Sequence, residues 1–177
     1  MEPMNYTCEN KTEKKVIVLS YLTSLSLIIV FFLLGYQIRG ETIITDSLTG
    51  YTAYDIFIHN QFISLISFFG VFLLGIPNLF IIIMNFFELG NIFGAYQETY
   101  SLIGAFQKIA SYGIFEIPSI VISNSVGYLL IYALYHRVVS QKKINIKYYS
   151  KYIIKMLVLT FLLNIIAAYF EAFYLNK

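Results

Sequence analysis

Residues 56–96 read IFIHNQFISLISFFGVFLLGIPNLFIIIMNFFELGNIFGAY, an almost unbroken apolar run. A helix that crosses a membrane once needs about 20 apolar residues, so this run is too long for one crossing and suits two. Gly75-Ile76-Pro77 lies near its middle, and glycine can end one helix while proline opens the next. The run therefore predicts two membrane helices, at 57–74 and 77–95, joined by a tight turn.

Three further apolar segments lie outside this run, at 16–36, 109–136 and 152–174. The longest of the five segments, 109–136, contains Pro118, which removes a backbone hydrogen bond and crowds the carbonyl of Ile114. We expect 109–117 to be a short half-helix or re-entrant turn and 118–136 to complete the crossing. Residues 97–108 are predicted to be a short connection. The fold class is thus an all-α bundle of about five transmembrane helices, forming one membrane domain over 1–177.

The composition excludes several classes of protein. Hydrophobic residues make up 58% of the chain and charged residues 12%, whereas soluble domains carry about 25% charged residues. Cys8 is the single cysteine, so no internal disulfide can form. The chain has no phosphate-binding loop, dinucleotide fingerprint, zinc-protease motif or serine-hydrolase motif. No motif predicts a metal, a known cofactor or a nucleic acid partner, and the bilayer is the expected surrounding.

The distribution of basic residues predicts the orientation, because Lys and Arg concentrate in cytoplasmic segments. If residues 1–15 are cytoplasmic, the outside holds only Arg39, Lys108 and Lys177. The inside then holds the other nine basic residues, with Lys155 just within the membrane: Lys11, Lys14, Lys15, Arg137, Lys142, Lys143, Lys147, Lys151 and Lys155. The N-terminus is therefore predicted to be cytoplasmic.

Polar side chains within the apolar segments are candidates for a functional site. An ionisable group in hydrocarbon is costly and usually faces the bundle interior. In the predicted topology, most such residues fall at a similar depth in the outer leaflet, which predicts a polar cluster or cavity open to the outside. The candidates are Glu88, Glu116, Glu171, His59, Asn60, Asn85, Asn124 and Asn164.

Glu116 and Glu171 are the candidate acid–base pair of this cluster. Two carboxyl groups in one site of low dielectric cannot easily both ionise, so they would share a proton and could serve general acid–base chemistry. With His59 the set could also hold a metal ion. The alternative is that these side chains only hydrogen-bond across helices and fix their packing, or that a glutamate lies close enough to the interface to be solvated.

Two other patterns point to contacts. Gly90 and Gly94 have the spacing of small residues that lets helix backbones approach, either inside the bundle or between two copies of the chain. The basic run from Arg137 to Lys151 is typical of contact with anionic lipid headgroups, or of an ordinary cytoplasmic loop.

Three segments together resemble the stage II sporulation protein M (SpoIIM) family of small membrane proteins. They are His59-Asn60 with the Gly75-Ile76-Pro77 turn, Asn85 and Gly90; then Gly113-Ile114-Phe115-Glu116-Ile117-Pro118-Ser119; and finally Ala167-Ala168-Tyr169-Phe170-Glu171-Ala172-Phe173. The likeness covers roughly residues 16–174. Ser111-Tyr112 stands where the family often has Pro-His, and Phe86 where it often has glycine, so Tyr112 or His59 would have to take the place of that histidine.

The resemblance implies a multi-pass protein of the bacterial cytoplasmic membrane. Short relatives occur in gene clusters for circular bacteriocins, which implies a role in maturation (leader removal or cyclisation), export or immunity of a hydrophobic peptide. If the chain is an enzyme, one glutamate would act as general base and the other as acid on a peptide bond or acyl intermediate. Two alternatives stay open: a scaffold that recruits a transporter or cell-wall hydrolases, and a proton-coupled transporter or channel.

Overall fold

A computed structural model describes residues 4–38, 52–141 and 143–175 of the chain. These residues form four long helices and one short 3₁₀-helix, and no strand occurs among them. The elements are α1 (Met4–Ile38), α2 (Ala53–Phe69), η1 (Gly70–Leu73), α3 (Ile76–Ser140) and α4 (Ile146–Leu175).

The helices contain five segments that are long and apolar enough to cross a membrane: Thr12–Ile38, Ala53–Leu73, Ile76–Ala110, Gly113–Val139 and Ile146–Phe173. This confirms the predicted all-α bundle of about five transmembrane helices. Many large apolar side chains are exposed on the outside of the bundle, among them Leu22, Ile29 and Phe62. Such a surface suits hydrocarbon rather than water.

The α2–α3 turn lies at the Gly75-Ile76-Pro77 motif. Leu74 and Gly75 both adopt left-handed backbone conformations, and Pro77 lies in the first turn of α3, where its missing N–H costs no hydrogen bond. The Gly75 N–H donates to the Gly70 carbonyl over 2.8 Å. The polypeptide chain therefore reverses direction within a few residues.

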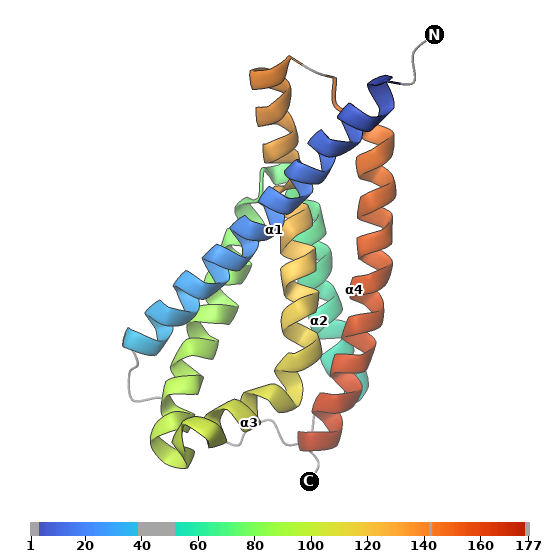
Figure 1. Cartoon of the computed structure of the whole chain (residues 1–177). Helices are drawn as coiled ribbons and strands as arrows, with labels where there is room; N and C mark the ends of the chain where they lie inside the picture. The colour runs from blue at the N-terminus through green and yellow to red at the C-terminus, as the bar shows by residue number, and fades with distance from the viewer. Residues whose placement is uncertain (1–3, 39–51, 142, 176–177) are drawn as a thin grey trace.

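The chain also changes direction within α3, at Ser101. Its φ of 79° and ψ of 168° are not helical, and its hydroxyl oxygen accepts a bond from the Gly104 N–H at 3.5 Å, as a capping residue does. The predicted connection at 97–108 is thus helical apart from this single break. Figure 1 shows the stretch after Ser101 running across one end of the bundle before the chain turns back toward the other end.

The two ends of the bundle differ in charge. The start of α1 and the α3–α4 connection lie at one end, with Lys14, Lys15, Arg137 and Lys143 exposed there, and we name it the basic end (Figure 1). The Ser101 bend and the end of α4 lie at the opposite end, as Figure 1 shows, and we name it the acidic end for the glutamates described below.

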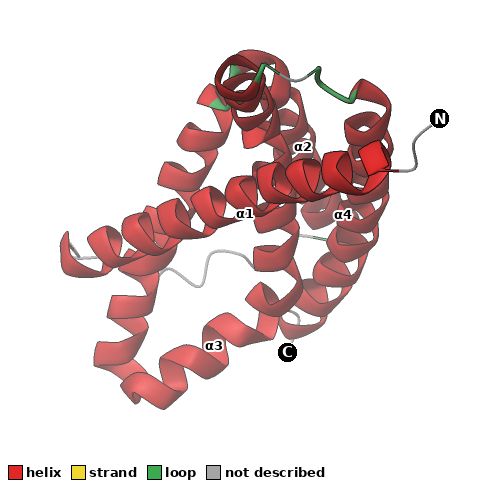
Figure 2. Cartoon of the chain, turned by 45° about the horizontal axis from the view of Figure 1, so that its top comes forward, coloured by secondary structure: helices red, strands yellow, loops and turns green. Residues whose placement is uncertain are grey.

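Helix α1 crosses the other helices obliquely, as Figure 2 shows. Its Ile28 packs in one core cluster with Ile82, Phe86, Ile120 and Tyr128 of α3. The crossing brings backbones together, because a Cβ at Gly90 would overlap the carbonyl of Phe32, and one at Gly35 would overlap the carbonyl of Phe87. Gly90 therefore serves close packing inside the bundle.

Candidate functional site

The structure brings Glu116 of α3 and Glu171 of α4 together at the acidic end. Both side chains are partly buried, and they are close enough for their charges to interact. The rings of the preceding residues, Phe115 and Phe170, pack with their centroids 5.1 Å apart. This aromatic contact holds the two segments side by side, so the two carboxyl groups form one site, the carboxyl pair.

A hydrogen-bonded centre lies next to the carboxyl pair, further into the bundle. The hydroxyl of Ser119 donates to Asn164 Oδ1, and Asn164 Nδ2 donates to Gln61 Oε1 at 3.1 Å and to Ser64 Oγ at 3.0 Å. Asn164 thus ties α2, α3 and α4 together. Ala167 and Ala168, which are fully buried between Asn164 and Glu171, let α4 approach closely.

A second centre lies nearer the basic end. Asn78 Nδ2 donates to the carbonyl of Ser67 at 3.0 Å and to that of Asn124 at 3.4 Å. A Cβ at Gly70 or at Gly127 would overlap the Asn78 amide, so the two glycines make the space that this side chain fills. Asn78 is fully buried and joins α2 to both halves of α3.

The two centres belong to a set of buried polar side chains on α2, α3 and α4, which we name the polar seam. On α2 and α4 its members recur at helical spacing, so they face the same interface. The seam consists of Asn60, Ser64, Ser67, Asn78, Ser119, Ser123, Asn124, Thr160 and Asn164, each of them buried.

Four buried atoms of the seam have no hydrogen-bond partner in the structure. They are Asn60 Nδ2, Thr160 Oγ1, Asn124 Oδ1 and Asn78 Oδ1. A buried polar atom without a partner costs roughly 1–3 kcal/mol, so such atoms usually bind ordered water. The seam therefore offers several binding positions for water inside the bundle.

The other residues predicted for the polar cluster lie elsewhere. Glu88 and His59 are exposed, and the amide of Asn85 donates to the carbonyl of Ile81 in its own helix, at 2.8 Å. Asn124 belongs to the seam, but it lies beside Asn78 and not beside the carboxyl pair. Asn60 is buried on α2, next in sequence to Gln61. Gly94 is buried on α3, and the side chain of Tyr112 is outside the described part of the structure.

Within the described residues, no group of three His, Cys, Asp or Glu side chains is placed to hold a metal ion. Carboxyl groups can exchange protons, and the hydroxyl and amide groups beside the pair can form hydrogen bonds.

An apolar groove of about 490 Å³ lies on the other side of the segment that carries Glu116. Gly113, Ile114, Ile117 and Pro118 form part of its wall, while Glu116 and Ser119 belong to the side that meets α4. The rest of the lining comes from apolar side chains of α1 and α3, including Ile28, Phe32, Phe86, Phe93 and Phe106. The groove and the carboxyl pair thus lie on two faces of one short segment.

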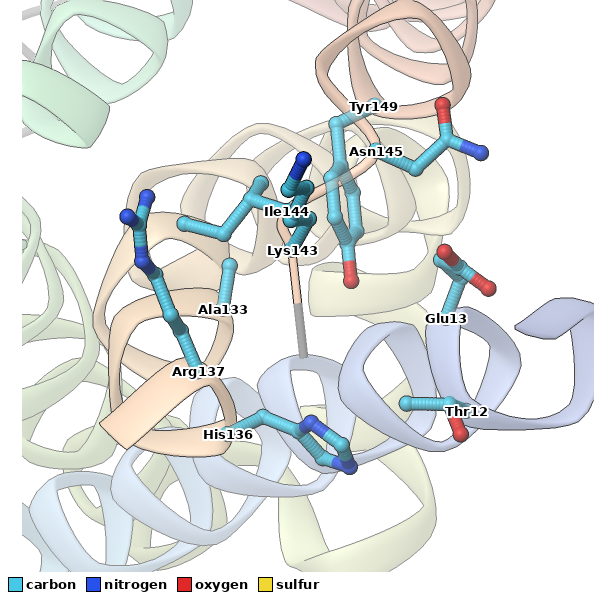
Figure 3. A pocket seen from close by; sticks show the side chains of 9 residues that line it. All are labelled: Thr12, Glu13, Ala133, His136, Arg137, Lys143, Ile144, Asn145 and Tyr149. Carbon is cyan, nitrogen blue, oxygen red and sulfur yellow. The ribbon is translucent and has the colours of Figure 1, made fainter. Parts of the chain in front are cut away.

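A small polar pocket of about 30 Å³ lies at the basic end, about the volume of one water molecule. Figure 3 shows the hydroxyl of Tyr149 pointing toward its centre, between Glu13 and His136. Glu13 is buried and its Oε2 atom has no hydrogen-bond partner. The pocket joins α1, the end of α3 and the start of α4, so it suits a bridging water.

Asn78 is the main residue that reasoning from the sequence missed, because that reasoning concentrated on ionisable groups. Ser64, Gln61 and Ser119 were missed for the same reason. The available signal was the recurrence of Asn60, Ser64 and Ser67 at helical spacing in an apolar segment, and the position of Asn78 directly after the Gly-Ile-Pro turn.

The comparisons with known proteins give one match. The sequence profile of the family described as stage II sporulation protein M matches residues 22–174. No curated protein and no solved structure matches the chain. The matched range contains the carboxyl pair and the whole polar seam.

Proposed function

Since the chain belongs to the stage II sporulation protein M (SpoIIM) family, we propose that it is an accessory membrane protein for a hydrophobic secreted peptide of the circular-bacteriocin class. It would act in the maturation, export or immunity of that peptide. Its place would be the bacterial cytoplasmic membrane, with the basic end in the cytoplasm and the acidic end facing outward.

The observation that carries this proposal is the position of the apolar groove beside the carboxyl pair. The groove has an entirely apolar lining, at membrane depth, and could take an uncharged apolar segment of a peptide. Its wall, residues 113–118, also carries Glu116. A peptide whose apolar segment lies in the groove could bring a flanking peptide bond past this segment to the two carboxyl groups, about one helix width away.

In a maturation role, the two carboxyl groups would divide the work of cleaving a peptide bond. One glutamate would take a proton from the attacking water, and the other would give a proton to the departing amine. The water is thereby added across the broken bond, which releases the linear peptide, and the pair returns to its starting state after one proton exchange. Joining the ends of that linear peptide in a later step loses one water. Ser119 and Asn164 would hold the neighbouring helix segments in register.

The proposal is tested by intact-mass measurement of secreted and membrane-bound peptides in the native host. We compare the wild type, a deletion and Glu116→Gln, with Glu88→Gln as the matched control, all at equal protein level. Glu88 is exposed and outside the carboxyl pair, so its substitution should leave the peptides unchanged. We expect a processed peptide, notably one lighter by one water than its linear form, to be lost in the deletion and in Glu116→Gln.

Other outcomes point to the alternative functions. An unchanged peptide profile in all strains would contradict the proposal and favour a scaffold for envelope remodelling. Loss of the peptide in the deletion but not in Glu116→Gln would retain the accessory role and exclude chemistry at the carboxyl pair.

A further inference from the structure

The polar seam extends through much of the membrane thickness. On α4, Thr160 and Glu171 are separated by about 16 Å of helix at 1.5 Å per residue, and a bilayer core is about 30 Å thick. Nearer the basic end, the seam includes Asn78, which donates to the carbonyls of Ser67 and Asn124. Ser67 is about one helical turn before Gly70. At Gly70 the chain leaves α2 for the turn that leads into α3, on the side of the basic end. Buried polar side chains are therefore distributed from the neighbourhood of the carboxyl pair toward the basic end.

Helix packing alone does not account for this arrangement. Asn164 and the Asn78 Nδ2 group have hydrogen-bond partners on other helices, as expected of side chains that fix helix packing. Thr160 Oγ1 and Asn124 Oδ1, by contrast, are fully buried without a partner, and so is Asn78 Oδ1. Valine and leucine would pack equally well at such positions without leaving a polar atom unpaired.

We propose that the polar seam, filled by ordered waters at its unpaired atoms, carries protons between the carboxyl pair and the basic end. This function does not depend on the role proposed for the peptide. A water, or a hydroxyl such as that of Thr160, which makes no hydrogen bond in the structure, can donate one hydrogen bond while it accepts another, so it can pass a proton along a chain. The unpaired amide atoms of Asn60 and Asn124 would hold the waters in line.

The transfer is balanced as a net movement of one proton. A proton that binds a glutamate at the acidic end enters the first hydroxyl or water of the seam, and each member passes on its own proton. The last water releases a proton at the basic end, and the glutamate is ready to bind another. No bond other than O–H bonds forms or breaks, and movement of K⁺ in the opposite direction compensates the charge in an experiment.

The test uses the purified full chain in liposomes that contain a pH-sensitive dye. A K⁺ gradient with valinomycin drives protons inward, and the rate of acidification is compared with that of protein-free liposomes. The decisive variant is Thr160→Val. Its unpaired hydroxyl makes no hydrogen bond in the structure, so its removal should not lower the thermal stability. Thr99→Val, an exposed position on α3, is the matched control.

We expect proton flux with the wild type and with Thr99→Val, and a fall to the rate of protein-free liposomes with Thr160→Val. The melting temperature, measured in the same detergent, should be unchanged in Thr160→Val. Wild-type flux no faster than that of protein-free liposomes would overturn the proposal, and so would undiminished flux in Thr160→Val. Because Thr160 is outside the carboxyl pair, an altered flux with an unaltered peptide profile would separate this function from the peptide role.

Discussion

At the scale of single residues, Asn78 shows how one amide can organise a membrane bundle. Its Nδ2 group donates to two backbone carbonyls, and its side chain fills the space left by Gly70 and Gly127. In hydrocarbon, a backbone carbonyl finds no water to bind, so a buried amide that serves two of them is well placed. The two glycines are needed because any side chain there would displace the amide.

The prediction at this scale concerns Gly127→Ala. The added Cβ would overlap the pinned amide of Asn78, so we expect a loss of about 1–3 kcal/mol in the free energy of unfolding, typical of overpacking. Unfolding in mixed detergent micelles measures it. Gly113→Ala is the control, because its Cβ would meet the movable end of Ile117 at 3.1 Å. Equal destabilisation by both substitutions would refute the conclusion that Gly127 is needed to make room for the Asn78 amide.

At the scale of elements, the crossing of α1 over α3 depends on two glycines, one on each helix, that lie against the backbone of the other helix. Gly35 lies against the carbonyl of Phe87, and Gly90 lies against the carbonyl of Phe32. Lipid tails are as apolar as leucine, so helices associate in membranes through close packing rather than through the hydrophobic effect. The position of α1, and with it one wall of the apolar groove, follows from this contact.

We therefore expect Gly90→Leu to separate α1 from α3, because the Phe32 carbonyl belongs to the backbone and cannot rotate away. We expect the midpoint of thermal unfolding in detergent to fall. We expect the rate of proteolysis within α1 to rise. Ser26→Leu adds the same bulk at an exposed position of α1 and should change neither. A Gly90→Leu protein as stable as Ser26→Leu would show that the crossing does not need the glycine.

At the scale of the whole molecule, the five crossings place charge asymmetrically. The exposed lysines near the start of α1 and in the α3–α4 connection share one end, and Lys108 lies after the Ser101 bend near the other. An odd number of crossings puts the start of α1 and the end of α4 on opposite sides, as Figure 1 shows. Positive charge favours the cytoplasmic side, which gives the expected orientation.

Cysteine labelling of intact cells tests this orientation. In a Cys8→Ser background, Lys143→Cys should react only after the membrane is opened, whereas Gln107→Cys should react with an impermeant reagent added outside. Both positions are exposed in the structure, so a lack of reaction reports the membrane side rather than burial. Labelling of Lys143→Cys from outside would reverse the orientation, and labelling of both from one side would contradict the number of crossings.

The sequence by itself determined the membrane class, the all-α bundle of about five crossings, the turn at Gly75-Ile76-Pro77 and the family. These follow from runs of apolar residues and from glycine and proline, whose effects are local and depend on neighbours along the chain. The depth of a polar residue also follows from its place in a run. This is why Glu116 and Glu171 could be expected at one level of the membrane.

Only the tertiary structure decided which of these residues meet. Depth does not fix the direction in which a side chain leaves its helix relative to the other helices. Glu88 was therefore grouped with Glu116 by depth, yet it is exposed, whereas Glu171 lies beside Glu116. The fit of the Asn78 amide against Gly70 and Gly127 depends in the same way on how the helices rotate and pack. So do the hydrogen bonds that Asn164 makes between α4 and α2. Packing between segments far apart in the chain sets that rotation, and no local pattern of residues encodes it.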